Sequence, residues 1–163
     1  MADDPTPAPL PDPVRERIVQ HCETSLWAID GTGAYYFALA DVQRGKITAP
    51  DDLTKLPAAS LEEGDEAPTQ DTNLLLTHVL PLGIEVWLRS GKDDPPLQTL
   101  ANRMLADVER ALTADPTRGG LAKRTTPVGT SGVQDAAPGV LTSVLANFEI
   151  EYYTRQGDPA STG

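Results

Sequence analysis

The side chains best suited to chemistry in this sequence are two histidines and a single cysteine: His21, Cys22 and His78. His21 and Cys22 are adjacent in a segment expected to be helical, where neighbouring side chains point about 100° apart, so they cannot bind one metal ion together. His78 interrupts an apolar run and has no second ligand near it in the sequence. We therefore expect His78 to be a core or interface residue, and we expect no metal, no cofactor and no catalytic residue.

Short motifs lead to the same expectation. Gly31-Thr32-Gly33 contains part of a dinucleotide-binding fingerprint. It lacks the third glycine and would join a helix to a following strand, the reverse of the order that places a pyrophosphate at a helix N-terminus. The sequence also lacks a nucleophile elbow, a Walker loop and the spacing of zinc ligands. An enzyme is therefore not expected.

A dense acidic patch lies in the loop-like stretch 47–71. Its carboxylates are Glu62, Glu63, Asp65 and Glu66. No base is paired with them, so a solvated surface is favoured over an acid–base site. Four basic side chains could meet this patch on a neighbouring copy: Arg44, Lys46, Lys123 and Arg124. Scattered solvent charges explain the same pattern equally well.

The composition limits the classes of partner. The chain has 163 residues and a formal net charge of −11, which suits one domain and opposes a nucleic-acid role, since phosphate binding needs clustered Lys and Arg. No apolar run approaches the roughly 20 residues of a membrane span, so no membrane partner is expected. A lone cysteine rules out an internal disulfide, and the N-terminal residues lack the features of a signal peptide. We expect the protein to be made and used in a reducing cytoplasm.

The stretch 72–91 is the element around which the rest is predicted to pack. From Leu74 to Leu88 its even-numbered positions are apolar apart from His78, and its odd-numbered positions are mixed, which is typical of a strand buried on one face. The alternation continues through Pro81 and Gly83. We therefore favour one long strand bent at Pro81 over two strands joined by a Pro-Leu-Gly turn. Because Pro81 cannot donate to a ladder, it should mark an edge, a bulge or a point where the strand changes partners.

Two amphipathic helices are predicted to cover that strand. The first spans about 13–29, with Asp12 as its N-cap and an apolar stripe at i+4 spacing. The second starts after Pro95-Pro96 and ends before Asp115-Pro116, because the residue preceding a proline avoids the helical region. Its expected outer face carries Arg103, Asp107 and Arg110.

The remaining segments predict further strands. Residues 33–42 are apolar on both faces, which indicates a central strand. Residues 58–61 and 121–128 have weaker strand patterns, and 129–138 is predicted to be a loop. Residues 140–155 alternate clearly and predict the last strand. The expected fold is α+β, a mainly antiparallel β-sheet with two amphipathic helices packed on one face. Residues 1–11 are predicted to be a disordered acidic, Pro-rich tail, 12–155 a single domain, and 156–163 a flexible tail.

The order of these elements resembles the tail terminator (tail-completion, minor tail) proteins of long-tailed phages. The resemblance spans about 13–155 and is carried by the segments VRERIVQHCETSLWAI, ADVQRGKI, LPLGIEVWLR, LADVERALTADPTRGGLA and FEIEYYTR. Shared features are Arg44-Gly45 after a strand, the 115–120 turn, and a closing strand with Tyr152, Tyr153 and Arg155. The Pro-rich N-terminal tail and the weak strand after Gly120 depart from the pattern.

The resemblance implies a structural virion protein, assembled in the host cytoplasm and located at the head-proximal end of the tail. Copies would form a homo-hexameric ring that caps the major tail-tube protein, terminates tube polymerisation and presents the surface for the head–tail connector. The side chains expected at partner interfaces are Arg44, Lys46, Glu62, Glu63, Asp65, Glu66, Arg103, Asp107, Arg110, Arg118 and Arg155. The alternatives are a head–tail joining (neck) protein of similar fold and a cytoplasmic, non-enzymatic binding module.

Overall fold

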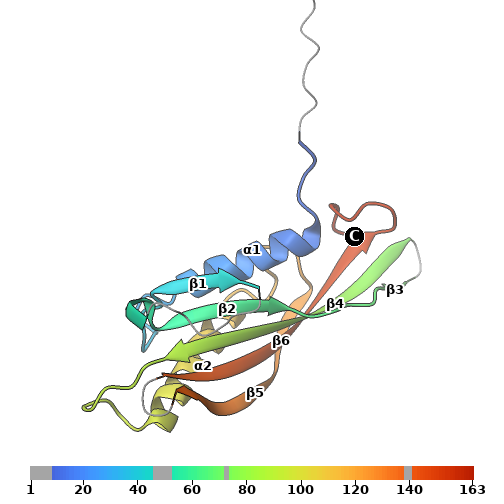
Figure 1. Cartoon of the computed structure of the whole chain (residues 1–163). Coiled ribbons are helices and arrows are strands. Elements are labelled where there is room, and N and C mark those ends of the chain that lie inside the picture. Colours follow the sequence, from blue (N-terminus) through green and yellow to red (C-terminus); the bar gives the residue numbers. More distant parts are fainter. Residues whose placement is uncertain (1–8, 46–52, 72–73, 138–140) are drawn as a thin grey trace, which may run out of the picture.

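The computed structural model describes residues 9–45, 53–71, 74–137 and 141–163 and has an α+β fold (Figure 1). The helices are α1 (Val14–Trp27) and α2 (Leu97–Thr113), with a short 3-10 helix, η1 (Leu53–Lys55). The strands are β1 (Asp41–Arg44), β2 (Ala58–Glu63), β3 (Thr69–Gln70), β4 (Leu75–Leu88), β5 (Arg124–Ala137) and β6 (Leu141–Arg155). The six strands form one sheet in the order β1-β2-β4-β6-β5, and β3 pairs with one end of β4. All pairs are antiparallel except β1 with β2, which confirms the predicted fold class.

The long central strand is confirmed as one element. β4 runs for 14 residues and pairs with β6 along its whole length, from Leu75 opposite Arg155 to Leu88 opposite Thr142. On its other side β4 pairs with β2 from Leu82 onward and with β3 at Leu76 and Thr77. Pro81 therefore lies where the strand changes partners, which is one of the three positions expected for it.

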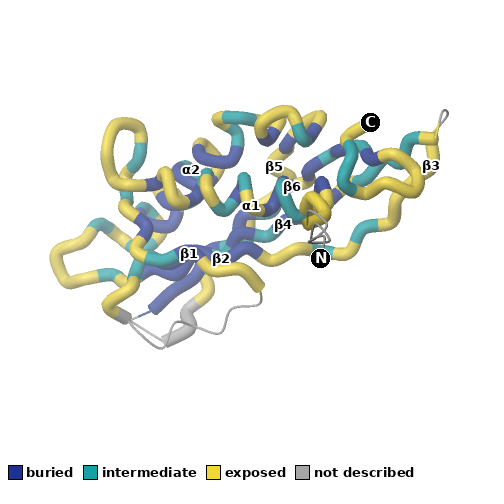
Figure 2. The backbone as a smooth tube through the Cα atoms, turned by 90° about the horizontal axis from the view of Figure 1, so that it is seen from above, coloured by how far each residue is buried: buried dark blue, intermediate teal, exposed yellow. Residues whose placement is uncertain are grey.

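The core lies between the sheet and both helices, which cover the same face (Figure 2). Alternate residues of β4 are buried on this inner face: Leu80, Leu82, Ile84, Val86 and Leu88. The predicted stripe of α1 is completely buried against them: Val14, Ile18, Cys22 and Leu26. Burial of these side chains supplies the main driving force for folding. The opposite face of the sheet, here called the outer face, carries neither helix.

The predicted central strand over 33–42 is wrong. Only residues 41–44 form a strand, at the edge of the sheet, and Tyr36 is 59% exposed. The backbone N–H groups of Tyr36 and Phe37 donate to the carboxylate of Asp107, at 2.9 and 3.0 Å, instead of to a neighbouring strand. The composition of this segment favours a strand, but a tertiary contact takes the place of strand pairing for these two N–H donors.

Two segments assigned to loops contain more strand than predicted. β2 extends the weak 58–61 pattern to Glu63 and lies inside the sheet, between β1 and β4. β5 continues to Ala137, through most of the predicted loop 129–138. Register shifts interrupt its pairing with β6 at Pro127/Gly129, Ser131/Gln134 and Asp135/Ala137. Such bulges accommodate the proline and glycines that made the segment look irregular.

The predicted N-cap of α1 is also wrong. Pro13 occupies that position without a side-chain cap, and the N–H of Val14 donates to the carbonyl of Pro159 at 2.9 Å. Asp12 instead accepts a hydrogen bond from Gln20 at 3.2 Å. The chain after β6 thus folds back and provides a hydrogen-bond acceptor for a free N–H group at the start of α1. Within the described residues, neither helix is long and apolar enough to cross a membrane.

Candidate interaction surfaces

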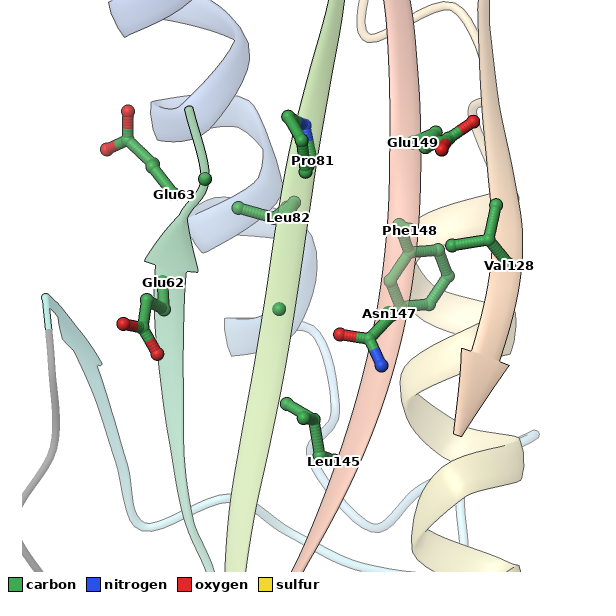
Figure 3. A pocket seen from close by; sticks show the side chains of 11 residues that line it. Glu62, Glu63, Pro81, Leu82, Val128, Leu145, Asn147, Phe148 and Glu149 are labelled. Carbon is green, nitrogen blue, oxygen red and sulfur yellow. The ribbon is translucent and has the colours of Figure 1, made fainter. Parts of the chain in front are cut away.

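The outer face of the sheet contains an open depression of about 270 Å³, here called the outer groove (Figure 3). Its lining includes Glu62, Pro81, Gly83, Val128, Leu145, Asn147 and Glu149. These residues come from four neighbouring strands, β2, β4, β6 and β5. The volume is just below the roughly 300–1,000 Å³ of typical small-molecule sites, and it suits a few side chains of a partner.

The floor of the outer groove is apolar and its rim is acidic. Val128 is 50% exposed, and nearby Val79 on β4 is 42% exposed. The carboxylates of Glu62 and Glu149 make no ion pair or hydrogen bond with any other described residue. The groove therefore combines exposed apolar surface with unpaired negative charge.

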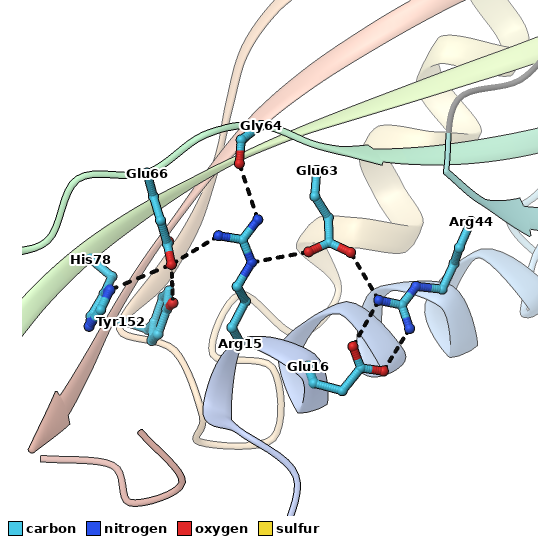
Figure 4. Close-up of polar contacts among 8 residues, drawn as sticks. All are labelled: Arg15, Glu16, Arg44, Glu63, Gly64, Glu66, His78 and Tyr152. Carbon is cyan, nitrogen blue, oxygen red and sulfur yellow. Dashed lines mark hydrogen bonds and ion pairs between the residues drawn. The ribbon is translucent and has the colours of Figure 1, made fainter. Parts of the chain in front are cut away.

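The neighbouring acidic residues are, in contrast, tied into a network beside α1, here called the Arg15 network (Figure 4). Arg15 contacts Glu63 at 3.1 Å and Glu66 at 3.0 Å, and it also donates to the carbonyl of Gly64 at 3.1 Å. Arg44 pairs with Glu16 at 2.7 Å and with Glu63 at 2.9 Å. The hydrogen bond from Arg44 is the main reason that the pKa of Glu16 is lowered, and the same bond raises the pKa of Arg44.

Glu66 continues this network into the sheet. The hydroxyl of Tyr152 donates to Glu66 at 2.8 Å, and His78 Nδ1 lies 3.6 Å from the same carboxylate oxygen. The rings of His78 and Tyr152 stack with centroids 4.5 Å apart, and His78 Nε2 lies 2.9 Å from Thr154 Oγ1. Burial, followed by the contact with Glu66, raises the pKa of Tyr152. These contacts fasten the chain after β2 onto β4 and β6.

The expected pairing of basic residues with the acidic patch of a neighbouring copy does not fit these contacts. Arg44 binds carboxylates of its own chain, and the carboxylates of Glu63 and Glu66 pair with arginines of the same chain. Lys123 and Arg124 both pair with Glu151, at 2.7 and 2.9 Å. Their partners lie far away in the sequence, so the spacing of charges gave no signal for them. Lys46 lies outside the described residues.

Asp107 was predicted on the outer face of its helix, and this is wrong because its side chain is fully buried. Its Oδ2 accepts both backbone N–H groups described above, and Arg110 lies 3.4 Å from Oδ1. Arg110 also donates to the carbonyl of Ala34. Burial raises the pKa of Asp107 against the opposing effect of these hydrogen bonds. The signal missed in the sequence is the spacing, because position 107 follows Leu100 and Met104 on the apolar stripe.

Arg118 was expected at a partner interface, and this is also wrong because none of it is exposed. Its Nε donates to Thr125 Oγ1 at 3.1 Å and its Nη1 to Ser25 Oγ at 3.2 Å, so it joins α1 to the start of β5. Cys22 is buried beside it, and burial raises the pKa of the thiol to about 11 although Arg118 opposes the shift. Arg118 is therefore a residue of the interior.

The other expected interface residues remain at the surface. Glu62, Asp65, Arg103 and Arg155 are exposed. Arg103 lies over the ring of Tyr36, with 5.4 Å between the guanidinium carbon and the ring centroid. Of the acidic patch, Glu62 and Glu63 line the outer groove; Glu63 is paired with Arg15 and Arg44, and the unpaired carboxylate is that of Glu62. Sequence reasoning did not identify Gly83, Asn147 and Glu149 as its companions.

In the ranges that the structure describes, no group of three or more His, Cys, Asp and Glu side chains is arranged to hold a metal ion. The outer groove and the exposed edges of the sheet are described features that could bind a partner. Neither a scan of protein-family models nor a search of curated proteins finds a match to this chain.

Proposed function

We propose that this protein is a structural subunit of a phage tail that forms a ring of its own copies, caps the tail tube and offers a surface to the head–tail connector. The observation that carries the proposal is the one-sided sheet. Both helices pack on the inner face, and the outer face keeps exposed apolar side chains, Val79 and Val128. The order of elements that resembles tail terminators supports the same role.

The two edges of the sheet suit such a ring. β1 and β5 each pair with one strand, and no other described strand lies on their outer sides. They differ in length and irregularity, with 4 and 14 residues. A closed ring needs contacts between two different patches on neighbouring subunits, and two unlike edges provide them. The bulges and Pro127 in β5 limit uncontrolled edge-to-edge pairing.

The net negative charge of the chain favours assembly of the ring on the end of the tail tube over assembly in solution. Each copy carries a formal net charge of −11, so free copies repel one another. Binding to the end of a tube would hold the copies together and offset this repulsion. The intact protein should therefore have a lower mass in solution than on the tube.

Electron microscopy of growing tubes tests the proposal. The major tail-tube protein from the same genome is polymerised with and without the purified protein, and tube lengths and tube ends are compared. We expect shorter tubes and a ring of density at one end. Light scattering measures the mass of the free protein in solution, which should be lower than the mass of the ring on the tube. Unchanged tube lengths and bare ends would refute the proposed function.

A further inference from the structure

The outer groove owes its depth to a glycine that the backbone does not require. Gly83 lies in the interior of β4, its φ is not left-handed, and an added Cβ would meet Leu145 Cδ1 at 3.4 Å, an ordinary contact. The register of β4 at Gly83 is regular against both β2 and β6, so there is no bulge. A glycine in a strand interior weakens the strand, and it often marks a place where another chain approaches closely.

An asparagine borders this glycine on the next strand. The register places three lining residues of the groove in one row: Glu62, Gly83 and Asn147. The side chain of Asn147 extends from β6 toward β4 (Figure 3), and it bonds to no other described group. Its amide therefore offers donors and an acceptor to the main chain of a bound segment.

The rim of the groove would attract positive charge. Glu62 and Glu149 are unpaired within the described chain, while the nearby cations are already occupied. Arg15 and Arg44 bind Glu63. Lys123 and Arg124 bind Glu151, which lies two residues beyond Glu149 on the same face of β6. The groove thus keeps a surplus of carboxylates that no neighbouring side chain neutralises.

We propose that the outer groove binds an extended segment of a partner protein that carries lysine or arginine beside small apolar residues. The apolar side chains would cover Gly83, Val128 and Leu145, and the cations would pair with Glu62 and Glu149. A second copy of this chain is a poorer occupant, because its net charge of −11 places like charges across the interface. The proposal does not depend on the ring-forming role.

An NMR titration of the isotope-labelled full chain tests this assignment. The probe is a nonapeptide made of lysine, alanine and valine. We expect shift changes at the amides of Gly83, Val128 and Asn147, which line the groove, and binding that weakens as salt is added. A peptide in which glutamate replaces lysine should cause no change.

Two substitutions report on the floor and the rim separately. Gly83→Val should weaken peptide binding by at least about 10-fold, because its side chain takes the space of one apolar anchor. Glu62→Gln combined with Glu149→Gln should weaken it by about 3- to 10-fold at low salt. Should Gly83→Val fail to fold, Gly83→Ala, which keeps ordinary contacts, and the double glutamate variant carry the test.

Gly132→Val and Glu109→Gln are the matched controls, because each changes the same residue type outside the groove. Gly132 lies in β5 with open space around an added Cβ, and Glu109 is exposed on α2. Both should leave the Kd unchanged within about twofold. An absence of shift changes, changes elsewhere on the protein, or an unchanged Kd in the groove variants would overturn the proposal. Shifts of the same amides with protein concentration alone would place a second copy in the groove and would also overturn it.

Discussion

Replacement of Asp107 should separate the role of its oxygen atoms from the role of its charge. One oxygen, Oδ2, accepts the backbone N–H groups of both Tyr36 and Phe37, at 2.9 and 3.0 Å. The carboxylate is fully buried, and its other oxygen lies 3.4 Å from Arg110. Asp107→Ala removes every acceptor at this place. Asp107→Asn keeps one carbonyl oxygen that can accept both N–H groups.

The expected loss of stability follows from these contacts. Each backbone N–H left without an acceptor costs about 1–3 kcal/mol. Two effects offset part of this loss. The higher helix propensity of alanine stabilises the variant by about 0.5 kcal/mol, and the variant no longer bears the desolvation cost of a buried carboxylate. Asp107→Ala should therefore lower the free energy of unfolding by about 2–3 kcal/mol, and Asp107→Asn by less than about 1 kcal/mol.

Urea unfolding followed by circular dichroism measures both variants, with Glu109→Ala as an exposed control on the same helix. The control should stay within about 0.5 kcal/mol of the wild type. Because burial raises the pKa of Asp107, its contribution to stability should decline as the pH rises from its ordinary value of 3.8 through the raised value. Asp107→Asn should lack this decline. An alanine variant as stable as the wild type, or an asparagine variant as damaged as alanine, would refute the reasoning.

Three further predictions concern charged residues elsewhere in the chain. Hydrogen bonds from Thr117 and Gly119 lower the pKa of Asp115 to about 2, so its contribution to stability is present above pH 3.8 and is lost as the pH falls toward 2; Asp115→Asn should flatten acid unfolding curves in that window. Arg118→Met should change the free energy of unfolding by less than about 1 kcal/mol, whereas Arg118→Ala should cost at least about 2 kcal/mol because it leaves a cavity; equal losses in chemical unfolding would contradict this. Arg44→Met should cost no more than about 1 kcal/mol. It should also raise the pKa of Glu16, which carbon-detected NMR titration measures; an unchanged pKa would show that the Arg44 pair is not formed in solution.

The strands and helices with regular patterns could be predicted because their patterns are local. From Leu80 onward the even positions of β4 are buried in the core as the alternation indicated, whereas Leu76 and His78 are only partly buried, and the i+4 stripe of α1 is buried throughout. The mistakes fall where composition and context disagree. Residues 33–40 are rich in aromatic and apolar side chains, yet Asp107 binds the backbone of Tyr36 and Phe37, and Ala38 forms an isolated bridge with Asp30 instead of a strand. β5 contains proline and glycine, yet its bulges let it pair with β6.

The fate of the charged residues could not be predicted from their spacing. Arg44 and Glu16 are 28 residues apart, and Arg15 and Glu63 are 48 apart. Both pairs form because β1 and β2 lie beside α1, which is a property of the sheet order. The outer groove arises in the same way, since Glu62, Gly83 and Asn147 meet only through the register of three strands.

By itself, the sequence determined the one-sided character of the sheet and the two helices that cover it, because hydrophobic periodicity is set by neighbouring residues along the chain. Tertiary structure alone decided which polar side chains are free to meet a partner. It buried Asp107 and Arg118, engaged Arg44 and Glu63 within the chain, and left Glu62 and Glu149 unpaired. The physical reason is that burial and ion pairing depend on distances of a few ångströms between segments far apart in the sequence, and those distances exist only in the folded chain.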